Sequence, residues 1–502
     1  MLQRQAEALL LRGDRSEAVL AYRALLSAAP TDAGAWFNLG YLLRHLGDHE
    51  GALRAYQQAL RCGVARPEEV HLNCAVLLSD HLGRPDSALV ELKRALEFAP
   101  GYAPALLNLG NLQEELGQRE AALATYSQLM RKTVQPASQA RLEALARVAH
   151  LSPPSALDDR LLVELRKAVA SSAENSFLNS TLRFSLGRSY DRLGAYAEAF
   201  QEFAAANRVA HRDHAHYHAE SAENATKAIC AAFDHRDRSS FRNDAGAPLF
   251  ICGMFRSGST LLEHVLSVHP DVVAGGELDL VPRLVRDHLP NFPNLNQDIS
   301  VDYQALARKY LSGRHSRLGP VPSSDYVTDK RLDNIAYIGL IKRMFPSAKI
   351  IFTRRHPMAT GLSVFMQHIN PARFRYAGRL EDIGHALGEQ NQLMEHWRNL
   401  FPGDIHDFDY DQFIDFPEAT LRSLLKFLDL PWHPGCLQFH TSSRIIKTAS
   451  YWQVRQPLHG RALRHWRNYS EWLQPLARTL RTAGFDVPET ELANPNHTAD
   501  DP

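Results

Sequence analysis

The chain has 502 residues, of which 45% are hydrophobic and 22% are charged, and its 56 Lys and Arg balance 56 Asp and Glu. This length exceeds what one hydrophobic core supports, so we expect at least two domains. Balanced charge predicts no nucleic-acid surface, and no apolar run reaches the ~18 residues of a membrane span. The five cysteines are far apart and form no Cys-x-x-Cys pair, which favours a reducing, cytoplasmic setting.

The N-terminal part of the chain is repetitive. A glycine recurs at intervals of 34, 36 and 34 residues, with an alanine five residues later and an apolar side chain four residues further on. These positions are Gly13, Gly47, Gly83 and Gly117; Ala18, Ala52, Ala88 and Ala122; and Tyr22, Tyr56, Leu92 and Tyr126. The pattern resembles the tetratricopeptide (TPR) repeat, a helix–turn–helix unit that buries its apolar face only against its neighbours. We expect an α-helical solenoid over residues 1–134.

A less regular helical region follows over residues 135–245. It contains one late copy of the pattern, at Leu186-Gly187 with Gly194, Ala199 and Phe203. TPR solenoids present a concave groove suited to extended chains, so we expect a peptide or protein partner there.

From residue 246 the pattern changes to short apolar runs that alternate with helical segments. The expected strands are Leu249–Cys252, Lys349–Thr353 and the weaker Ile405–Asp409, and the expected helices are Thr260–Ser267, Met358–His368 and Glu418–Leu428. This alternation predicts an α/β, P-loop-like domain with a parallel sheet over residues 246–490, whose ligand lies beyond the carboxyl ends of the strands. We expect residues 491–502 to be a disordered tail.

The most informative motif links the first of these strands to its helix. Gly253, Gly258 and Thr260 have the spacing of a phosphate-binding loop, with Ser259 in place of the usual Lys and Arg256 inside the loop. Backbone N–H groups and a helix N-terminus can still bind an anion here, but the Lys that contacts a triphosphate is missing. The loop therefore indicates a nucleotide whose reactive anion is not a triphosphate.

A second motif predicts a second anion site. Arg355 leaves the next strand, and Ser363 lies about two turns along the following helix. A ligand with two separate anionic groups matches 3′-phosphoadenosine-5′-phosphosulfate (PAPS). At this point the domain resembles a sulfotransferase, although His356 and Met358 depart from the family's motif.

Among sulfotransferases, the tyrosylprotein enzymes and bacterial TPR-containing relatives are the most similar. The resemblance implies that Arg256, Ser257, Gly258, Ser259 and Thr260 bind the 5′-phosphosulfate and that Arg355 and Ser363 bind the 3′-phosphate. The resemblance implies that Glu277 is the catalytic base, with Gly276 in place of a companion Glu. It also implies that Lys330 and Arg256 stabilise the sulfuryl group during transfer. Tyr410 resembles a residue near the nucleotide, and Ser450, Gln453, Val454 and Arg455 resemble a C-terminal nucleotide-binding segment in which Ser450 has a transition-state position.

The leading interpretation is a PAPS-dependent sulfotransferase acting on an acceptor hydroxyl, with protein tyrosine, carbohydrate and small molecules all open as acceptors. Fixed cations and N–H groups can stabilise the charge that builds during sulfuryl transfer, so no metal is required. The alternatives are a TPR scaffold with an inactive nucleotide-binding domain and a P-loop kinase, which Ser259 disfavours. We interpret His264, His269 and His356 as structural.

Overall fold

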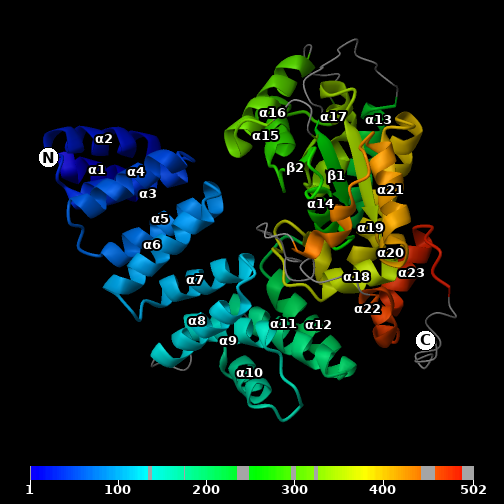
Figure 1. Cartoon of the computed structure of the whole chain (residues 1–502), viewed down its shortest axis with the longest axis horizontal. Coiled ribbons are helices and arrows are strands. Elements are labelled where there is room, and N and C mark those ends of the chain that lie inside the picture. Colours follow the sequence, from blue (N-terminus) through cyan, green and yellow to red (C-terminus); the bar gives the residue numbers. More distant parts are fainter. Residues whose placement is uncertain are drawn as a thin grey trace. The chain divides into compact units, whose positions relative to one another are not determined.

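The computed structural model describes residues 2–133, 138–174, 176–234, 248–294, 301–321, 326–441, 458 and 460–488. It divides into two compact units, Met1–Ser172 and Ala173–Pro502 (Figure 1). The expected tail at residues 491–502 lies outside the described residues.

The first unit consists of helices that pack as successive antiparallel pairs. The helices are α1 (Leu2–Arg12), α2 (Arg15–Ala28), α3 (Ala33–His45), α4 (His49–Arg61), α5 (Pro67–Val76), which continues as the π-helix η1 (Leu77–His81), α6 (Pro85–Phe98), α7 (Ala103–Glu115), α8 (Arg119–Lys132), α9 (Gln139–Leu151) and α10 (Arg160–Ser171). The expected N-terminal helical solenoid is therefore confirmed, and the last pair, α9 and α10, falls in the region where the sequence pattern weakens.

The repeated glycines and alanines have the roles that their spacing predicts. The turn glycines adopt positive φ, for example 84° at both Gly13 and Gly47, where an L side chain would be strained. The repeated alanines, such as Ala18 and Ala52, are fully buried. In two of the regular repeats a second glycine admits the aromatic ring of the paired helix: a Cβ on Gly40 would lie 2.7 Å from the Tyr56 ring, and one on Gly110 would lie 2.4 Å from the Tyr126 ring. Small residues thus set the close packing within each helix pair.

The second unit begins with three helices, α11 (Phe177–Arg192), α12 (Tyr196–His211) and α13 (Ala219–Ala232). The first two form the late repeat that the sequence predicts, because a Cβ on Gly187 would lie 2.8 Å from the Phe203 ring, as at Gly110 and Tyr126. The change from helices alone to alternating strands and helices falls after α13, whereas the division into compact units falls after Ser172.

Five parallel strands form the sheet of the second unit, in the order β2-β3-β1-β4-β5. Their bounds are β1 (Leu249–Gly253), β2 (Val272–Ala274), β3 (Tyr326–Asp329), β4 (Lys349–Arg354) and β5 (Ile405–Asp409). The three strands expected from apolar runs are confirmed, while β2 and β3 were not predicted because they are short. The chain leaves β1 toward β2 and leaves β4 toward β5, so the topological switch point lies between β1 and β4, where a ligand is expected.

Helices and short turns cover both faces of this sheet (Figure 1). They are α14 (Ser259–Leu266), α15 (Leu280–His288), α16 (Tyr303–Leu318), η3 (Leu332–Tyr337), α17 (Ile338–Met344), α18 (Pro357–Phe365), η4 (Arg375–Gly378), α19 (Leu380–Leu400), α20 (Tyr410–Asp415), α21 (Pro417–Phe427), η5 (Pro434–Thr441), α22 (Arg461–Arg464), η7 (His465–Tyr469) and α23 (Gln474–Thr482). The three expected helices correspond to α14, α18 and α21; α18 ends three residues earlier than expected.

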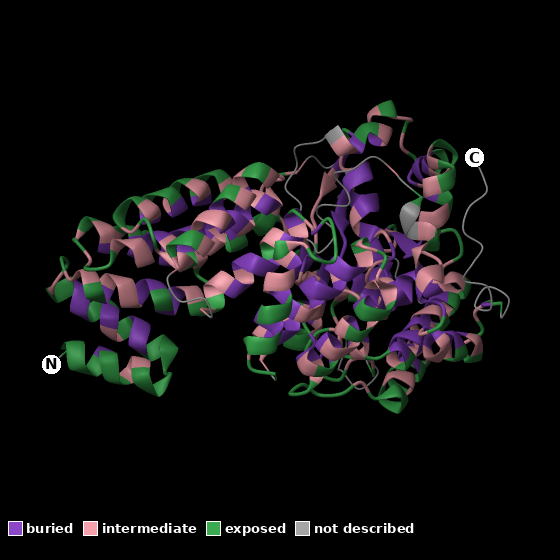
Figure 2. Ribbon diagram, turned by 90° about the horizontal axis from the view of Figure 1, so that it is seen from below, coloured by how far each residue is buried: buried purple, intermediate pink, exposed green. Residues whose placement is uncertain are grey.

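Side chains of β1 alternate between two cores. Figure 2 shows buried ribbon running through the interior of this unit. Phe250 packs in a core with Trp397 of α19 and with Phe233, which directly follows α13. Ile251 points to the opposite face and packs with Val265 of α14. Both faces of the strand are therefore covered, as the continuous apolar runs predict for a parallel sheet. The buried Phe233 and Ile229 show that the α13 segment, which precedes β1, contributes to the same core as the sheet.

Candidate active site

The anion loop has a backbone shape that few sequences permit. Gly253, Arg256 and Gly258 take φ values of 147°, 72° and 98°, and Gly258 directly precedes α14. A Cβ on Gly258 would lie 2.5 Å from the Tyr410 ring. The buried Ser257 hydroxyl donates to the Met254 carbonyl at 2.6 Å and lies 2.6 Å from the Thr353 hydroxyl of β4. These contacts fix a loop whose N–H groups can bind an anion.

Arg256 connects this loop to α18. Its Nε donates to the Ser363 hydroxyl at 2.9 Å. Burial, and after it the charge of Arg355, lower the pKa of Arg256 to about 10. Two neighbouring guanidinium groups in a buried site repel each other, so an anion that contacts both would be stabilised there.

Arg355, which directly follows β4, is held against the start of α20. Its guanidinium carbon lies 5.0 Å from the centre of the Tyr410 ring, and its Nε lies 4.0 Å from an Asp411 carboxylate oxygen. The other Asp411 oxygen accepts from the His356 backbone N–H at 2.6 Å, and the His356 ring stacks on Trp466. His356 thus makes structural contacts beside the motif in which it departs from the family.

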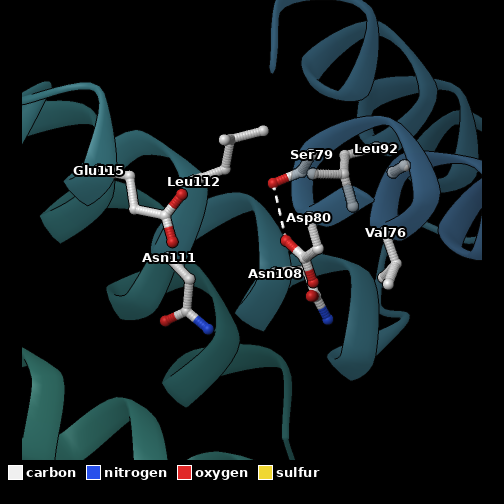
Figure 3. A pocket seen from close by; sticks show the side chains of 9 residues that line it. Val76, Ser79, Asp80, Leu92, Asn108, Asn111, Leu112 and Glu115 are labelled. Atoms are coloured by element: carbon white, nitrogen blue, oxygen red, sulfur yellow. Dashed lines mark hydrogen bonds between the residues drawn. The ribbon is translucent and has the colours of Figure 1, made fainter. Parts of the chain in front are cut away.

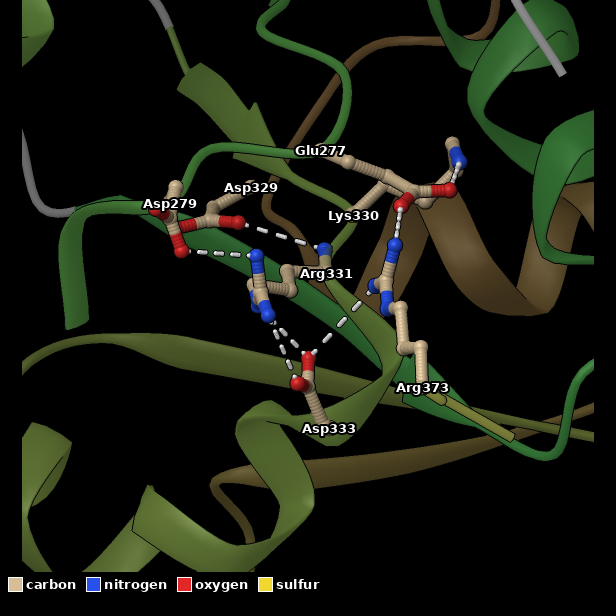
Figure 4. Close-up of polar contacts among 7 residues, drawn as sticks. All are labelled: Glu277, Asp279, Asp329, Lys330, Arg331, Asp333 and Arg373. Carbon is tan, nitrogen blue, oxygen red and sulfur yellow. Dashed lines mark hydrogen bonds and ion pairs between the residues drawn. The ribbon is translucent and has the colours of Figure 1, made fainter. Parts of the chain in front are cut away.

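Glu277 and Lys330 form the second group. Glu277 follows β2 and Lys330 follows β3, and the Lys330 ammonium donates to Glu277 Oε1 at 3.4 Å. Arg373 Nη1 donates to Glu277 Oε2 at 3.0 Å (Figure 4). Burial acts to raise the pKa of Glu277, but the charges of Lys330 and Arg373 together lower it below its ordinary value. Glu277 is therefore a carboxylate at neutral pH, as a proton acceptor must be.

A chain of ion pairs surrounds this carboxylate (Figure 4). Arg331 contacts Asp279 at 2.8 Å and Asp333 at 2.7 Å, and Asp333 lies 3.9 Å from Arg373. Asp329, which directly precedes Lys330, is fully buried. Burial raises the pKa of Asp329 to about 7, and its carboxyl group accepts a hydrogen bond from the Tyr310 hydroxyl at 2.9 Å.

Glu263 of α14 supports the turn that carries Glu277. Its buried Oε1 accepts from the Gly276 N–H at 2.9 Å and from the Thr328 hydroxyl at 2.6 Å. The sequence analysis did not single out Glu263, Asp411 or Arg373. A charged residue on the inward face of an apolar helix was a signal for Glu263, but the other two are ordinary loop charges in sequence.

Every described candidate lies at the same edge of the sheet. The anion loop follows β1, Glu277 follows β2, Lys330 follows β3, Arg355 follows β4 and Tyr410 follows β5. Parallel strands bring their carboxyl ends together, which explains how residues far apart in sequence converge. The remaining candidates, Ser450, Gln453, Val454 and Arg455, lie outside the described residues.

The described residues contain no group of three or more His, Cys, Asp or Glu placed to hold a metal ion. No helix in the described parts of the chain is long and apolar enough to cross a membrane.

This edge of the sheet brings together an anion loop, buried cations and an ionised carboxylate. A sulfotransferase family model matches residues 248–434, and two tetratricopeptide repeat models match residues 4–67 and 81–146. The chain thus carries TPR repeats followed by a sulfotransferase domain, and the predicted class is confirmed.

Curated relatives agree with this assignment. An uncharacterized protein of Aquifex aeolicus (strain VF5) is 28% identical over 445 residues, which are 85% of this chain and 56% of that protein. The protein-tyrosine sulfotransferase of Drosophila melanogaster is 24% identical over 38% of this chain and 39% of its own length, and protein-tyrosine sulfotransferase 1 of Homo sapiens is 25% identical over 49% and 70%. The chain therefore spans little more than half of the Aquifex relative.

Among solved structures, a sulfotransferase domain from the curacin biosynthetic pathway covers 48% of this chain and 99% of its own, with 18% identity and a TM-score of 0.34.

Proposed function

We propose that the chain transfers a sulfuryl group from PAPS to an acceptor hydroxyl. The observation that carries the proposal is the pairing of Glu277 with Lys330 at the sheet edge that also holds the anion loop. An ionised carboxylate can accept a proton, and the adjacent cations can stabilise the charge that builds on the transferring group.

The proposed reaction assigns each residue one task. Arg256 and the loop N–H groups bind the phosphosulfate, and Arg355 with Ser363 binds the 3′-phosphate. The acceptor oxygen forms a bond to sulfur while the bond from sulfur to the bridging oxygen breaks, and its electron pair leaves with 3′,5′-bisphosphoadenosine. The acceptor proton moves to Glu277, and Lys330 stabilises the sulfuryl oxygens.

A phenolic acceptor such as protein tyrosine fits the surroundings of Glu277. Phe255 of the anion loop packs against Phe374 with ring centres 4.9 Å apart, and Phe374 directly follows the Arg373 that binds Glu277. An aromatic wall beside a base favours an aromatic acceptor. Several relatives are named protein-tyrosine sulfotransferases, which also supports this class of acceptor.

The TPR unit is proposed to bind the peptide partner. A cavity of about 130 Å³ lies within this unit, between α5–η1, α6 and α7 (Figure 3). Its lining includes the polar residues Ser79, Asp80, Asn108, Asn111 and Glu115. Amides can hydrogen-bond to a peptide backbone, and the two carboxylates favour a basic side chain. All residues that line this cavity belong to the unit that we assign to partner binding.

Replacing the proposed base tests the function. We expect Glu277→Gln to lower turnover of radiolabelled PAPS by roughly 10²–10⁴-fold, because an amide cannot accept the acceptor proton. Its affinity for 3′,5′-bisphosphoadenosine, measured by calorimetry, should stay at the wild-type value. Near wild-type turnover would exclude Glu277 as the base, and tighter binding of ATP than of the bisphosphate by the wild type would favour a kinase instead.

Labelled transfer into a lysate, with and without protease, would show whether the acceptor is a protein.

A further inference from the structure

The loop between α18 and α19 contributes a cation to the proposed base. Arg373 Nη1 donates to Glu277 Oε2 at 3.0 Å, while the Lys330 ammonium is 3.4 Å from Oε1. The two cations therefore bind different oxygens of one carboxylate. Asp333 lies 3.9 Å from Arg373 on its other side, so the guanidinium bridges two carboxylates.

The two cations differ in their surroundings. The Lys330 side chain is 2% exposed, and its backbone N–H donates to the Gly276 carbonyl at 2.8 Å. The Arg373 side chain is 37% exposed. In the proposed reaction Lys330 stabilises the sulfuryl group, so its ammonium cannot at the same time neutralise Glu277 fully. Arg373 is then the cation that stays with the base.

The segment that carries Arg373 packs against two other parts of the unit, the anion loop and helix α12. Phe374 packs on Phe255 of the anion loop. On the other side, α12 lies close to the same segment, because a Cβ on Gly378 would lie 2.8 Å from the His211 ring. Arg373 is consequently fixed relative to the loop that binds the donor and to the late TPR-like helix pair.

We infer that Arg373 is a positioning residue, which orients the Glu277 carboxylate toward the acceptor and keeps it ionised while Lys330 serves the sulfuryl group. This inference rests on the proposed role of Glu277 as the base. It goes beyond that role because it places a further residue, from a segment outside the recognised motifs, in the transfer step.

One test follows the protonation of Glu277 without any acceptor. A carbodiimide with an amine nucleophile modifies protonated carboxyls, and mass spectrometry of the Glu277 peptide gives the modified fraction at each pH. Among the residues that the structure describes, three cations act on Glu277, namely Lys330, Arg373 and Arg331. In Arg373→Ala the pKa of Glu277 should rise, so modification should persist to higher pH than in the wild type. Arg373→Lys should restore most of the wild-type profile, because the contact uses one nitrogen.

The matched control is Arg375→Ala. Arg375 belongs to the same segment and is exposed, and the structure assigns it no ion pair among the described residues. This variant should show the wild-type profile. An unchanged profile in Arg373→Ala, or an equal change in Arg375→Ala, would overturn the inference.

The second arm measures turnover of PAPS with a tyrosine-containing peptide. Arg373→Ala should lose roughly 10²-fold in kcat, because a misplaced base no longer meets the acceptor proton. Its acid limb should move to higher pH, and binding of 3′,5′-bisphosphoadenosine should be unchanged. If Glu277→Gln is inactive but Arg373→Ala keeps the wild-type kcat, the positioning role of Arg373 is rejected while the proposed function stands. Full activity of Glu277→Gln would instead exclude Glu277 as the base, and a wild-type protein that turns over no PAPS would reject the proposed function.

Discussion

Arg355 and Arg354 are neighbours in sequence with different surroundings. The Arg355 side chain is 9% exposed and lies against Tyr410 and Asp411. The Arg354 side chain is 57% exposed and pairs with Asp409 at 3.2 Å. An exposed ion pair contributes little, whereas a buried guanidinium at the switch point of the sheet is placed to bind a ligand.

We therefore expect Arg355→Ala to weaken binding of 3′,5′-bisphosphoadenosine by about 1.5–3 kcal/mol, the value of a charge-assisted hydrogen bond. Binding of adenosine 5′-phosphosulfate, which lacks the 3′-phosphate, should change little. Isothermal calorimetry with both ligands measures the difference, and Arg354→Ala serves as the control with near wild-type affinity. Equal losses for the two ligands would show that Arg355 does not bind the 3′-phosphate.

At the scale of elements, helix pairs are held together by small residues opposite large rings. Gly110 of α7 faces Tyr126 of α8, whose hydroxyl lies 2.6 Å from a Glu114 carboxylate oxygen and 2.7 Å from the Asn111 amide oxygen. The ring is fully buried, so it has no free space into which to move. The close approach of the two helices depends on the missing side chain at position 110.

Gly110→Ala should therefore destabilise the TPR unit by ~1–3 kcal/mol, as overpacking does in other cores. The matched substitution is Gly101→Ala, because a Cβ at Gly101 meets nothing within 4 Å. Urea unfolding followed by circular dichroism compares the two variants. If both variants unfold at the same urea concentration, the missing side chain at position 110 is not needed for the packing of α7 and α8.

At the scale of the whole molecule, the helices α11–α13, which directly precede β1, are part of the unit that contains the sheet. Asn207 of α12 donates to the Phe365 carbonyl at the end of α18 at 2.8 Å. Asp191 of α11 accepts from the Tyr469 hydroxyl at 2.6 Å and pairs with His465 at 2.8 Å. Together with the buried Phe233, these contacts support the helix that carries Ser363.

Two truncations test this arrangement. A protein that begins at Ala173 retains α11–α13 and should bind 3′,5′-bisphosphoadenosine with nearly full-length affinity. A protein that begins at Pro248 loses Phe233 from the core, and removal of one such buried aromatic alone costs about 3–5 kcal/mol. We expect it to unfold at lower temperature or to be insoluble. If both truncated proteins showed equal stability and affinity, α11–α13 would be a separate module.

The sequence by itself predicted the features that depend on local spacing. Repeating Gly, Ala and Tyr positions predicted the helix pairs, because each turn glycine and each buried alanine acts within its own pair. Apolar runs predicted β1, β4 and β5, and glycine spacing predicted the anion loop. The roles assigned to Glu277, Lys330 and Arg355 remain predictions, although the structure places these residues at one edge of the sheet.

Only the tertiary structure decided which distant residues meet. Strand β2 has three residues and β3 has four, too few for a periodic pattern, so the five-strand order could not be read from the chain. Arg373 and Glu277 are 96 positions apart, and Asn207 and Phe365 are 158 apart. No local pattern encodes such pairs. The two residues of each pair come close to one another, and are buried, only once the sheet has aligned the ends of its strands.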